Sequence, residues 1–341
     1  MFKVKLKTGF RVDMNLSEIR KYVTTEFPEW QVKYEKMLAS LVRSDLQEWL
    51  DGDDSHDKSI GRYLSQLSLL ELKAFVLSAV EGHPASDRLA MAARLSAPRL
   101  PYAIGIQHLN TNSAISFPDF VNGLALTMTV GWKDWSELLG RLALQELEKD
   151  AIQRGKFHGG ALGQGVTSFG FPYAMMDIVA DWLKADEAAT MTEWREKVYD
   201  EYAGGYGGWS ELVEHWREPD VVAFHRILGK AADYHVAQSS DMTTTGDKRD
   251  KREKHYEIEP DAYWAFPVLL LMILRMREWE GLQNPGYLNH DLFQMGVFKE
   301  LPKPVLWPPD ALFDAADRKF RQEFPGTPST ADLPRLRAEQ S

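Results

Sequence analysis

The glycine-rich segment at residues 158–165, His-Gly-Gly-Ala-Leu-Gly-Gln-Gly, has the composition of an esterase oxyanion hole. Such a hole uses backbone amides to hold a developing negative charge. The chemistry also needs a nucleophile in Gly-x-Ser-x-Gly at a strand-to-helix turn, and Ser168 is one residue out of register for that motif. Since glycine also supplies flexible connections, we interpret this segment as a link between helices.

The densest acidic segment, residues 51–57, has the clustered carboxylates that hard cations bind. An EF-hand loop needs glycine at its sixth position and a bidentate glutamate at its twelfth, but His56 and Arg62 stand there. We therefore predict no metal site and expect an exposed acidic turn that a basic partner could contact. Its carboxylates are Asp51, Asp53, Asp54 and Asp57.

The remaining titratable groups show no catalytic or ligand pattern. His215, His225 and His235 are ten residues apart, which turns successive side chains to different faces of a helix. Glu257 and Asp261 have the one-turn spacing of an acid–base pair, but helix faces carry such pairs routinely. No Walker or dinucleotide-binding glycine motif occurs. We expect no cofactor, no bound metal and no catalytic group.

Composition narrows the class of protein. The hydrophobic fraction of 44% is typical of a globular chain, and the absence of cysteine excludes disulfides and thiolate chemistry. The net charge is −10, of which the first eleven residues contribute +4, leaving −14 for the rest. Because nucleic acids are bound through Lys and Arg, this balance argues against a nucleic-acid partner and favours a basic protein.

Helical patterns must position any functional residues in this chain. Apolar residues recur at helical spacing after Phe27-Pro28 and between Ile60 and Phe75. Three Phe-Pro pairs, at residues 117–118, 171–172 and 266–267, each open an apolar run. Two capping boxes are predicted, at Asp134 with Glu137 and at Thr190 with Glu193. The predicted fold class is all-α, a multi-helix bundle of antiparallel helix pairs.

The most hydrophobic of these segments, residues 261–276, stops at arginines after about three helical turns. A membrane-spanning helix needs about 20 apolar residues, so we expect the central helix of a core and no membrane partner. Residues 2–12 alternate around Thr8-Gly9 and predict a short N-terminal β element. They lack the apolar stretch of a secretory signal, so we expect a cytoplasmic protein.

The predicted organisation has three parts. Residues 1–84 form an N-terminal helical region that includes the β element, residues 85–324 form the main helical domain, and residues 325–341 form a loosely held tail. Connections are expected at residues 155–168, 204–208, 239–260 and 301–309, where Gly, Pro and polar residues gather.

Tyr263-Trp264-Ala265-Phe266 resembles the Gly-Tyr-Trp-(Ala/Ser)-Phe-Glu signature of the PoNi family, immunity proteins against PoNe-type DNase toxins of type VI and related secretion systems. The likeness runs in order over residues 90–300. Its most specific part is residues 209–292, where Pro-Gly-Tyr-Leu-Asn-His-Asp-Leu is similar to the family's closing motif. Ala262 and Pro267 depart from the signature, replacing its glycine and its acidic residue.

This resemblance implies a helical cytoplasmic protein that binds a cognate toxin and occludes its active site without catalysis. The expected contact residues, chosen by charge density, are Asp51, Asp53, Asp54, Asp57, Glu257, Glu259 and Asp261. Two alternatives stay open: a helical enzyme or small-molecule binder with an aromatic-lined pocket near Trp209, Trp216 and Trp264, and a scaffold of helix pairs. A deep polar pocket would favour the former and a broad acidic face would favour toxin binding.

Overall fold

The computed structural model describes residues 15–53, 60–83, 85–106, 115–153, 161–162, 170–184, 206–240, 257–258, 260–295 and 301–328. Within these ranges the chain is mostly helical and contains no strand, so the all-α prediction is confirmed. Backbone pairing of the β type occurs there only as an isolated bridge between Ser239 and Ile258. The predicted β element at residues 2–12 and the capping box at Thr190 lie outside the described residues.

Most of the chain is built from helices that follow one another closely. In order they are α1 (Leu16–Trp30), η1 (Gln31–Glu35), α2 (Lys36–Leu50), α3 (Ile60–Val80), α4 (Ser86–Ser96), α5 (Arg99–Ile106), α6 (Phe117–Thr129), α7 (Lys133–Gln153), α8 (Phe171–Leu183), η4 (Gly207–Trp209), α10 (Ser210–His215), α11 (Val221–Ala237), η6 (Asp261–Tyr263), α12 (Val268–Trp279), α13 (Asp291–Met295) and α14 (Ala311–Glu323).

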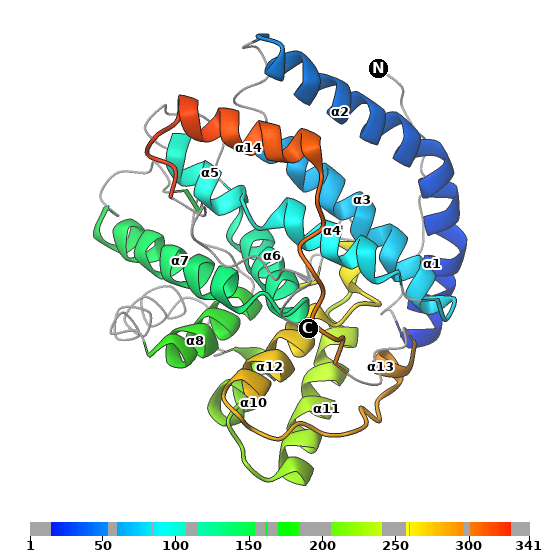
Figure 1. Ribbon diagram of the computed structural model, residues 1–341. Helices are drawn as coiled ribbons and strands as arrows, with labels where there is room; N and C mark the ends of the chain where they lie inside the picture. The colour runs from blue at the N-terminus through cyan, green and yellow to red at the C-terminus, as the bar shows by residue number, and fades with distance from the viewer. Residues whose placement is uncertain are drawn as a thin grey trace, which may run out of the picture.

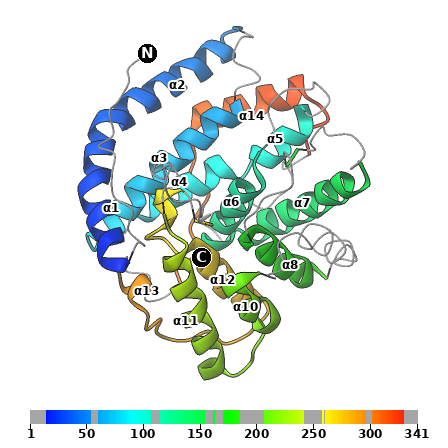
Figure 2. The ribbon, with the colours of Figure 1, turned by 180° about the vertical axis from the view of Figure 1, so that it is seen from behind.

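Helices α6 and α12 pack together at the centre, and the other helices surround them (Figure 1). Helices α3 and α4 make the most extensive contact between two helices among the described residues, and a turn at residues 81–82 ends α3. Helices α1 and α2 run along one side and over one end of the molecule, while α10 and α11 lie at the other end (Figure 2). Helix α14 lies beneath α2 (Figure 1).

Helices α1 and α2 form one continuous but bent helical rod through η1, a π-helical turn (Figure 1). The helical spacing noted after Phe27-Pro28 is confirmed, but the helix begins earlier, at Leu16, so Pro28 lies inside α1. Proline has no N–H to donate to the carbonyl one turn earlier and its ring crowds that carbonyl. Three residues later the backbone hydrogen bonds change from the α-helical to the wider π-helical spacing of η1. Such single π-helical turns are a recognised cause of bends in helices.

Buried apolar side chains form two separate clusters. The main cluster runs from Ile19 to Met295 and takes in both sides of the predicted boundary at residue 84. The second cluster joins the inner face of α2 to α14 and to one side of α3 and α5. Helix α1 therefore belongs to the main core, whereas α2 belongs to the second, and η1 connects them.

Local sequence signals fix several helix starts. Phe117-Pro118 and Phe171-Pro172 do open α6 and α8, and Pro267 immediately precedes α12. The predicted capping box at Asp134 is wrong, because α7 already begins at Lys133 and Asp134 lies inside its first turn.

The arginines expected to end the apolar run are part of the core. Helix α12 continues to Trp279, and Arg275 and Arg277 are both buried. Arg277 donates to the Trp216 carbonyl at 2.6 Å and the Gln283 carbonyl at 2.8 Å. Arginine supplies five donors in a fixed fork, so these side chains tie α12 to the loops at its end.

Among the described helices, α3 is long and apolar enough to cross a membrane. Its most apolar 18-residue window has a mean hydropathy of 1.3. In the structure 67% of that window is buried inside the protein, against α1 and α4. Core helices commonly meet the same test of length and composition, so the observation is weak evidence for a membrane span.

Candidate functional site

The aromatic signature at residues 263–266 lies inside the core. Trp264 and Phe266 are 2% and 0% exposed, and Tyr263 is also buried. The Trp264 indole N–H donates to the Ile258 carbonyl at 2.7 Å, and His235 Nε2 lies 2.9 Å from the Tyr263 carbonyl oxygen. These residues therefore hold the scaffold together and do not reach a surface.

Asp261, one of the predicted contact residues, is tied into the same region. Its carboxylate lies 2.8 Å from Lys73 Nζ on α3 and accepts a hydrogen bond of 3.1 Å from the Tyr22 hydroxyl on α1. The Lys73 ammonium also lies 3.9 Å from the centroid of the Trp30 ring. A buried cation held by a carboxylate and an aromatic face is stabilised from both sides, so Asp261 joins α1, α3 and η6.

Glu257 is also bound internally. Its Oε2 accepts from the backbone N–H of Phe171 at 2.9 Å and from the indole of Trp209 at 3.1 Å, while Oε1 accepts from the Tyr234 hydroxyl at 2.8 Å. The carboxylate thus caps the first turn of α8, where backbone N–H groups lack intrahelical partners. Burial raises the pKa of Glu257 above its usual value, and these donors oppose that shift.

The remaining predicted acids lie elsewhere. Asp51 and Asp53 are exposed at the end of α2, while Asp54, Asp57 and Glu259 lie outside the described residues. Asp51 follows α2, whose end lies at the outer edge of the molecule (Figure 1), whereas Glu257 contacts α8 and Asp261 contacts α1 and α3. The predicted acids that the structure describes do not form one surface.

An exposed stripe on the long outer rod is the feature that sequence reasoning missed. Val32, Met37 and Leu41 are 79%, 51% and 54% exposed. They account for half of the large hydrophobic side chains found exposed in the described residues. Apolar groups gathered on one exposed face are a common mark of a protein-binding surface. The sequence did contain a signal for this surface. By helical spacing, Met37 and Leu41 lie on a different face of the helix from the core residues Val42 and Leu46.

The π-helical turn aligns the three apolar side chains. Met37 and Leu41 are four residues apart and share a face of α2. Val32 precedes Met37 by five residues, which would set it off that face in a regular α-helix. Because a π-helical turn accommodates one extra residue, η1 brings Val32 toward the same line.

The stripe continues as an acidic face toward the end of α2. Ser44, Glu48 and Asp51 follow Leu41 at intervals of three, four and three residues, which keeps them on one line of the helix. All three are exposed, and the Ser44 hydroxyl donates to Glu48 Oε1 at 3.2 Å, as expected of side chains on one face. We call the line of Val32, Met37, Leu41, Ser44, Glu48 and Asp51 the outer stripe.

Helix α14 packs against α2 on the side away from the outer stripe and so fixes the direction in which the stripe faces. The opposite face of α2 carries Val42, Leu46 and Trp49, which pack in the second cluster with Phe320 of α14. Lys319 donates to the Trp49 carbonyl, and its ammonium lies 4.9 Å from the Trp49 ring centroid. Burying these apolar groups on one side leaves the outer stripe facing solvent.

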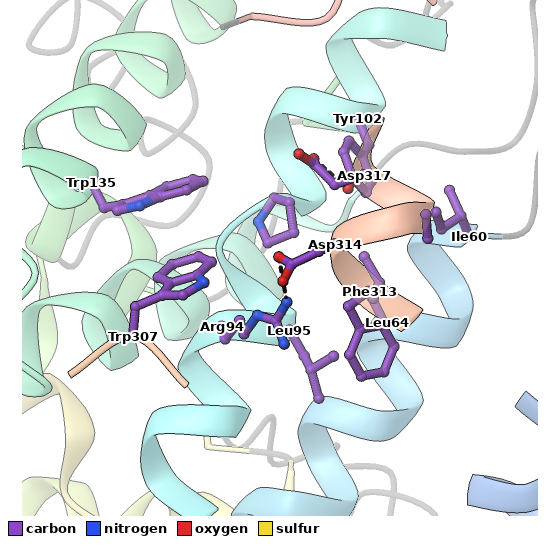
Figure 3. Close-up of a pocket in the computed structure, with 12 residues that line it drawn as sticks. Ile60, Leu64, Arg94, Leu95, Tyr102, Trp135, Trp307, Phe313, Asp314 and Asp317 are labelled. Atoms are coloured by element: carbon purple, nitrogen blue, oxygen red, sulfur yellow. Dashed lines mark hydrogen bonds and ion pairs between the residues drawn. The ribbon is translucent and has the colours of Figure 1, made fainter. Parts of the chain in front are cut away.

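A small pocket lies on the other side of α14, between α3, α4, α5 and α7 (Figure 3). The Arg94 guanidinium donates to Asp314 at 2.9 Å, and the Tyr102 hydroxyl donates to Asp317 at 2.7 Å. Burial, and then the nearby Asp317 carboxylate, raise the pKa of Tyr102 well above its usual value. The cavity volume is about 40 Å³, which holds a few waters, whereas ligand pockets commonly measure about 300–1,000 Å³.

The three tryptophans expected near an aromatic pocket are packed in the core. Trp209 and Trp216 are 0% and 3% exposed, like Trp264. The Trp216 indole donates to Asp181 at 2.8 Å, and those of Trp209 and Trp264 donate to the acceptors given above. Their rings are therefore occupied in joining α8, α10 and the signature segment.

Comparison of the chain with protein-family models, with curated proteins and with solved structures finds no match in any of the three. The residues and their geometry are therefore the basis of the functional argument. Of the surfaces described, the outer stripe combines exposed apolar and acidic side chains on one continuous helical element.

Proposed function

We propose that this chain is an immunity-type protein that binds a cognate toxin with a basic active-site face. The leading candidate for the toxin is a DNase. The chain blocks the active-site face by docking through the outer stripe. The observation that carries the proposal is the outer stripe itself, in which exposed Met37 and Leu41 are followed, after Ser44, by exposed Glu48 and Asp51 on the same helix face.

The two halves of the outer stripe supply different parts of binding. Exposed apolar side chains contribute affinity when a partner removes them from water. Carboxylates next to them favour a cationic partner and speed its encounter. A DNase active site is cationic because its substrate is a polyanion, so it has the charge that the acidic half of the stripe complements.

The resemblance of residues 263–266 to the PoNi signature supports the same class of partner, and the chain's charge of −10 supports the sign of the interaction. In this proposal the signature residues have a structural part. They anchor the core beside α1, which continues into α2. Inhibition is steric, because a docked helix prevents the toxin from reaching DNA.

The experiment is co-expression in bacteria with the product of the neighbouring gene, scoring growth rescue and co-purification. We expect the wild-type chain to rescue growth and the double variant Met37→Asp/Leu41→Asp to lose both rescue and co-purification. The matched control is Val222→Asp, which alters an apolar residue that is 60% exposed on α11 at the other end of the molecule. A neighbouring product that is harmless when expressed alone would contradict the proposal.

Small-molecule binding in the pocket of Figure 3 is the second candidate, favoured by the convergence of Arg94, Tyr102, Asp314 and Asp317 on it. Thermal-shift screening with small amines, carboxylates and phosphates tests it. A ligand that raises the melting temperature of the wild-type chain and not of Asp317→Asn would support this candidate over the first.

A further inference from the structure

Methionine is the residue type of this chain that a peroxide oxidises most readily, because the chain has 12 methionines and no cysteine. A cysteine thiolate would otherwise compete for such oxidants. The thioether sulfur of methionine reacts through a lone pair, so its rate depends on whether an oxidant can reach the sulfur. The exposure of each methionine in the fold therefore decides where oxidation occurs.

Met37 is the most exposed of the methionines that the structure describes. It is 51% exposed, on the outer stripe. Met91 is partly buried against the second cluster. The other described methionines are at most 7% exposed, and they are Met128, Met175, Met176, Met272, Met276 and Met295. A buried sulfur meets an oxidant only when the chain opens locally, so we expect Met37 to react first among these.

Met37 also lies in the middle of the apolar part of the outer stripe. Val32 precedes it and Leu41 follows it, and both are more than half exposed. Methionine is frequent at surfaces that bind proteins, because its flexible side chain fits many shapes. In the proposed complex this thioether lies against the toxin, whereas in the free chain it is open to solvent. The same sulfur atom thus combines access for an oxidant with a place in the docking surface.

We propose that Met37 is a site of reversible oxidation by peroxide and that its sulfoxide releases the toxin. The inference rests on the proposed function and adds a means of regulating it. The sulfur of Met37 attacks one oxygen of hydrogen peroxide, so that an S–O bond forms and the O–O bond breaks. The transferred oxygen gives its proton to the departing hydroxide, which leaves as water. The sulfur loses two electrons and the peroxide gains them.

The product changes the docking surface without changing the fold. A sulfoxide is polar where the thioether was apolar. In a dry apolar contact the sulfoxide oxygen would lose its water and gain no hydrogen bond, which is unfavourable. In the free chain the same oxygen stays in contact with water, since Met37 lies outside both buried clusters. Oxidation should therefore weaken binding and leave the stability of the chain nearly unchanged.

The first measurement needs no partner. The full chain is treated with dilute hydrogen peroxide, and peptide mapping by mass spectrometry follows the gain of one oxygen at each methionine over time. We expect Met37 to oxidise at least about tenfold faster than Met272 and Met295. Thermal unfolding followed by circular dichroism should be the same before and after Met37 is oxidised. Equal rates at Met37 and Met272, or a lower melting temperature, would overturn the inference.

The second measurement follows binding of the toxin, the product of the neighbouring gene, after the peroxide has been removed. We expect treatment to weaken binding by the wild-type chain at least about tenfold, and methionine sulfoxide reductase to restore it. Whatever the affinity of Met37→Leu before treatment, peroxide should not lower it. The matched control is Met91→Leu, which removes a different thioether and should lose affinity on treatment as the wild type does.

A loss of affinity in treated Met37→Leu would overturn the inference, because it would place the responsible oxidation elsewhere. An untreated chain that binds no toxin would contradict the proposed function and with it the release of the toxin. Equal binding before and after oxidation of Met37 contradicts the inference alone and leaves the proposed function standing.

Discussion

Individual charged residues in this protein are used largely to join helices. Glu257 collects an indole, a hydroxyl and a backbone N–H, while Asp261 holds Lys73 between α1 and α3. Arg277 places its guanidinium 3.6 Å from the Phe224 ring centroid and donates to loop carbonyls. Buried polar groups with such partners are costly to remove, because each deletion leaves a partner unsatisfied.

Replacing Glu257 tests its part in holding the scaffold. We expect Glu257→Ala to lower the free energy of unfolding by about 3–5 kcal/mol, because it leaves Trp209 and Phe171 N–H groups unpaired in the interior. Urea denaturation monitored by tryptophan fluorescence measures the change. The control is Glu211→Ala, which removes a surface pair with Lys230 and should change stability by less than about 0.5 kcal/mol. Similar losses in the two variants would contradict a buried anchor.

His235 makes stability depend on pH. Burial lowers its pKa from 6.5 to about 4, with a contribution from nearby His290. Between these values the unfolded chain binds a proton at this imidazole and the folded chain does not, so acid favours unfolding. The contribution of His235 to the free energy of unfolding is fully present above pH 6.5. It declines as pH falls toward 4, by up to about 3 kcal/mol.

The measurement compares urea denaturation of the wild-type chain and His235→Gln at pH 7 and pH 5. Glutamine cannot take up a proton in this range, so the variant should lose less stability on acidification, whatever its stability at pH 7. The same loss in both proteins would show that other groups control the acid response.

At the scale of elements, η1 separates two packing environments along one rod. Helix α1 buries Ile19, Val23 and Phe27 in the main cluster, and α2 buries its inner face in the second. Helix α14 completes the second cluster. The guanidinium of Arg43 on α2 lies 3.2 Å from the carboxylate of Asp310, the N-cap residue of α14. The position of α2 therefore depends on α14, although the two are distant in sequence.

Truncating a core residue of α14 tests this dependence. Phe320 is 0% exposed and packs 4.2 Å, centroid to centroid, from the Tyr102 ring. We expect Phe320→Ala to cost about 3–5 kcal/mol and to speed amide hydrogen exchange in α2 more than in α12. Gln322→Ala alters an exposed residue of the same helix and should leave exchange unchanged. Uniform acceleration across both helices would mean that the second cluster does not unfold separately.

At the scale of the whole molecule, negative charge is the property that acts over distance. The chain carries 50 Asp and Glu against 40 Lys and Arg. Lys73 and Arg94 are buried and pair with Asp261 and Asp314, whereas Glu48 and Asp51 are exposed to solvent toward the end of α2. Charge of this sign accelerates encounter with a cationic partner without itself setting the affinity.

The association rate with the toxin should therefore fall with salt. Raising ionic strength shortens the screening length from about 10 Å at 0.1 M to about 3 Å at 1 M. We expect the association rate constant, measured by stopped flow, to fall at least about tenfold over that range, with a smaller change in the dissociation rate. Glu48→Gln/Asp51→Asn should weaken the salt dependence. A salt-independent association rate would exclude electrostatic docking.

The sequence predicted most helices because their information is local. Apolar residues at helical spacing and Phe-Pro pairs specify α3, α6 and α8 without reference to distant partners. The local pattern did not indicate that Pro28 lies inside α1 or that the arginines of α12 are buried, and the reason is also physical. Proline and arginine are tolerated inside a helix when neighbouring segments supply what the helix lacks, and those neighbours are remote in sequence.

The sequence by itself determined that this chain folds as helices, is acidic and lacks cysteine chemistry, because composition and short-range periodicity decide those properties. Only the tertiary structure decided which acids are committed internally and which face solvent. Glu257 and Asp51 look alike in sequence, but one caps a distant helix and the other lies at an exposed helix end. That distinction arises from contacts between residues tens to hundreds of positions apart, which a local pattern does not contain.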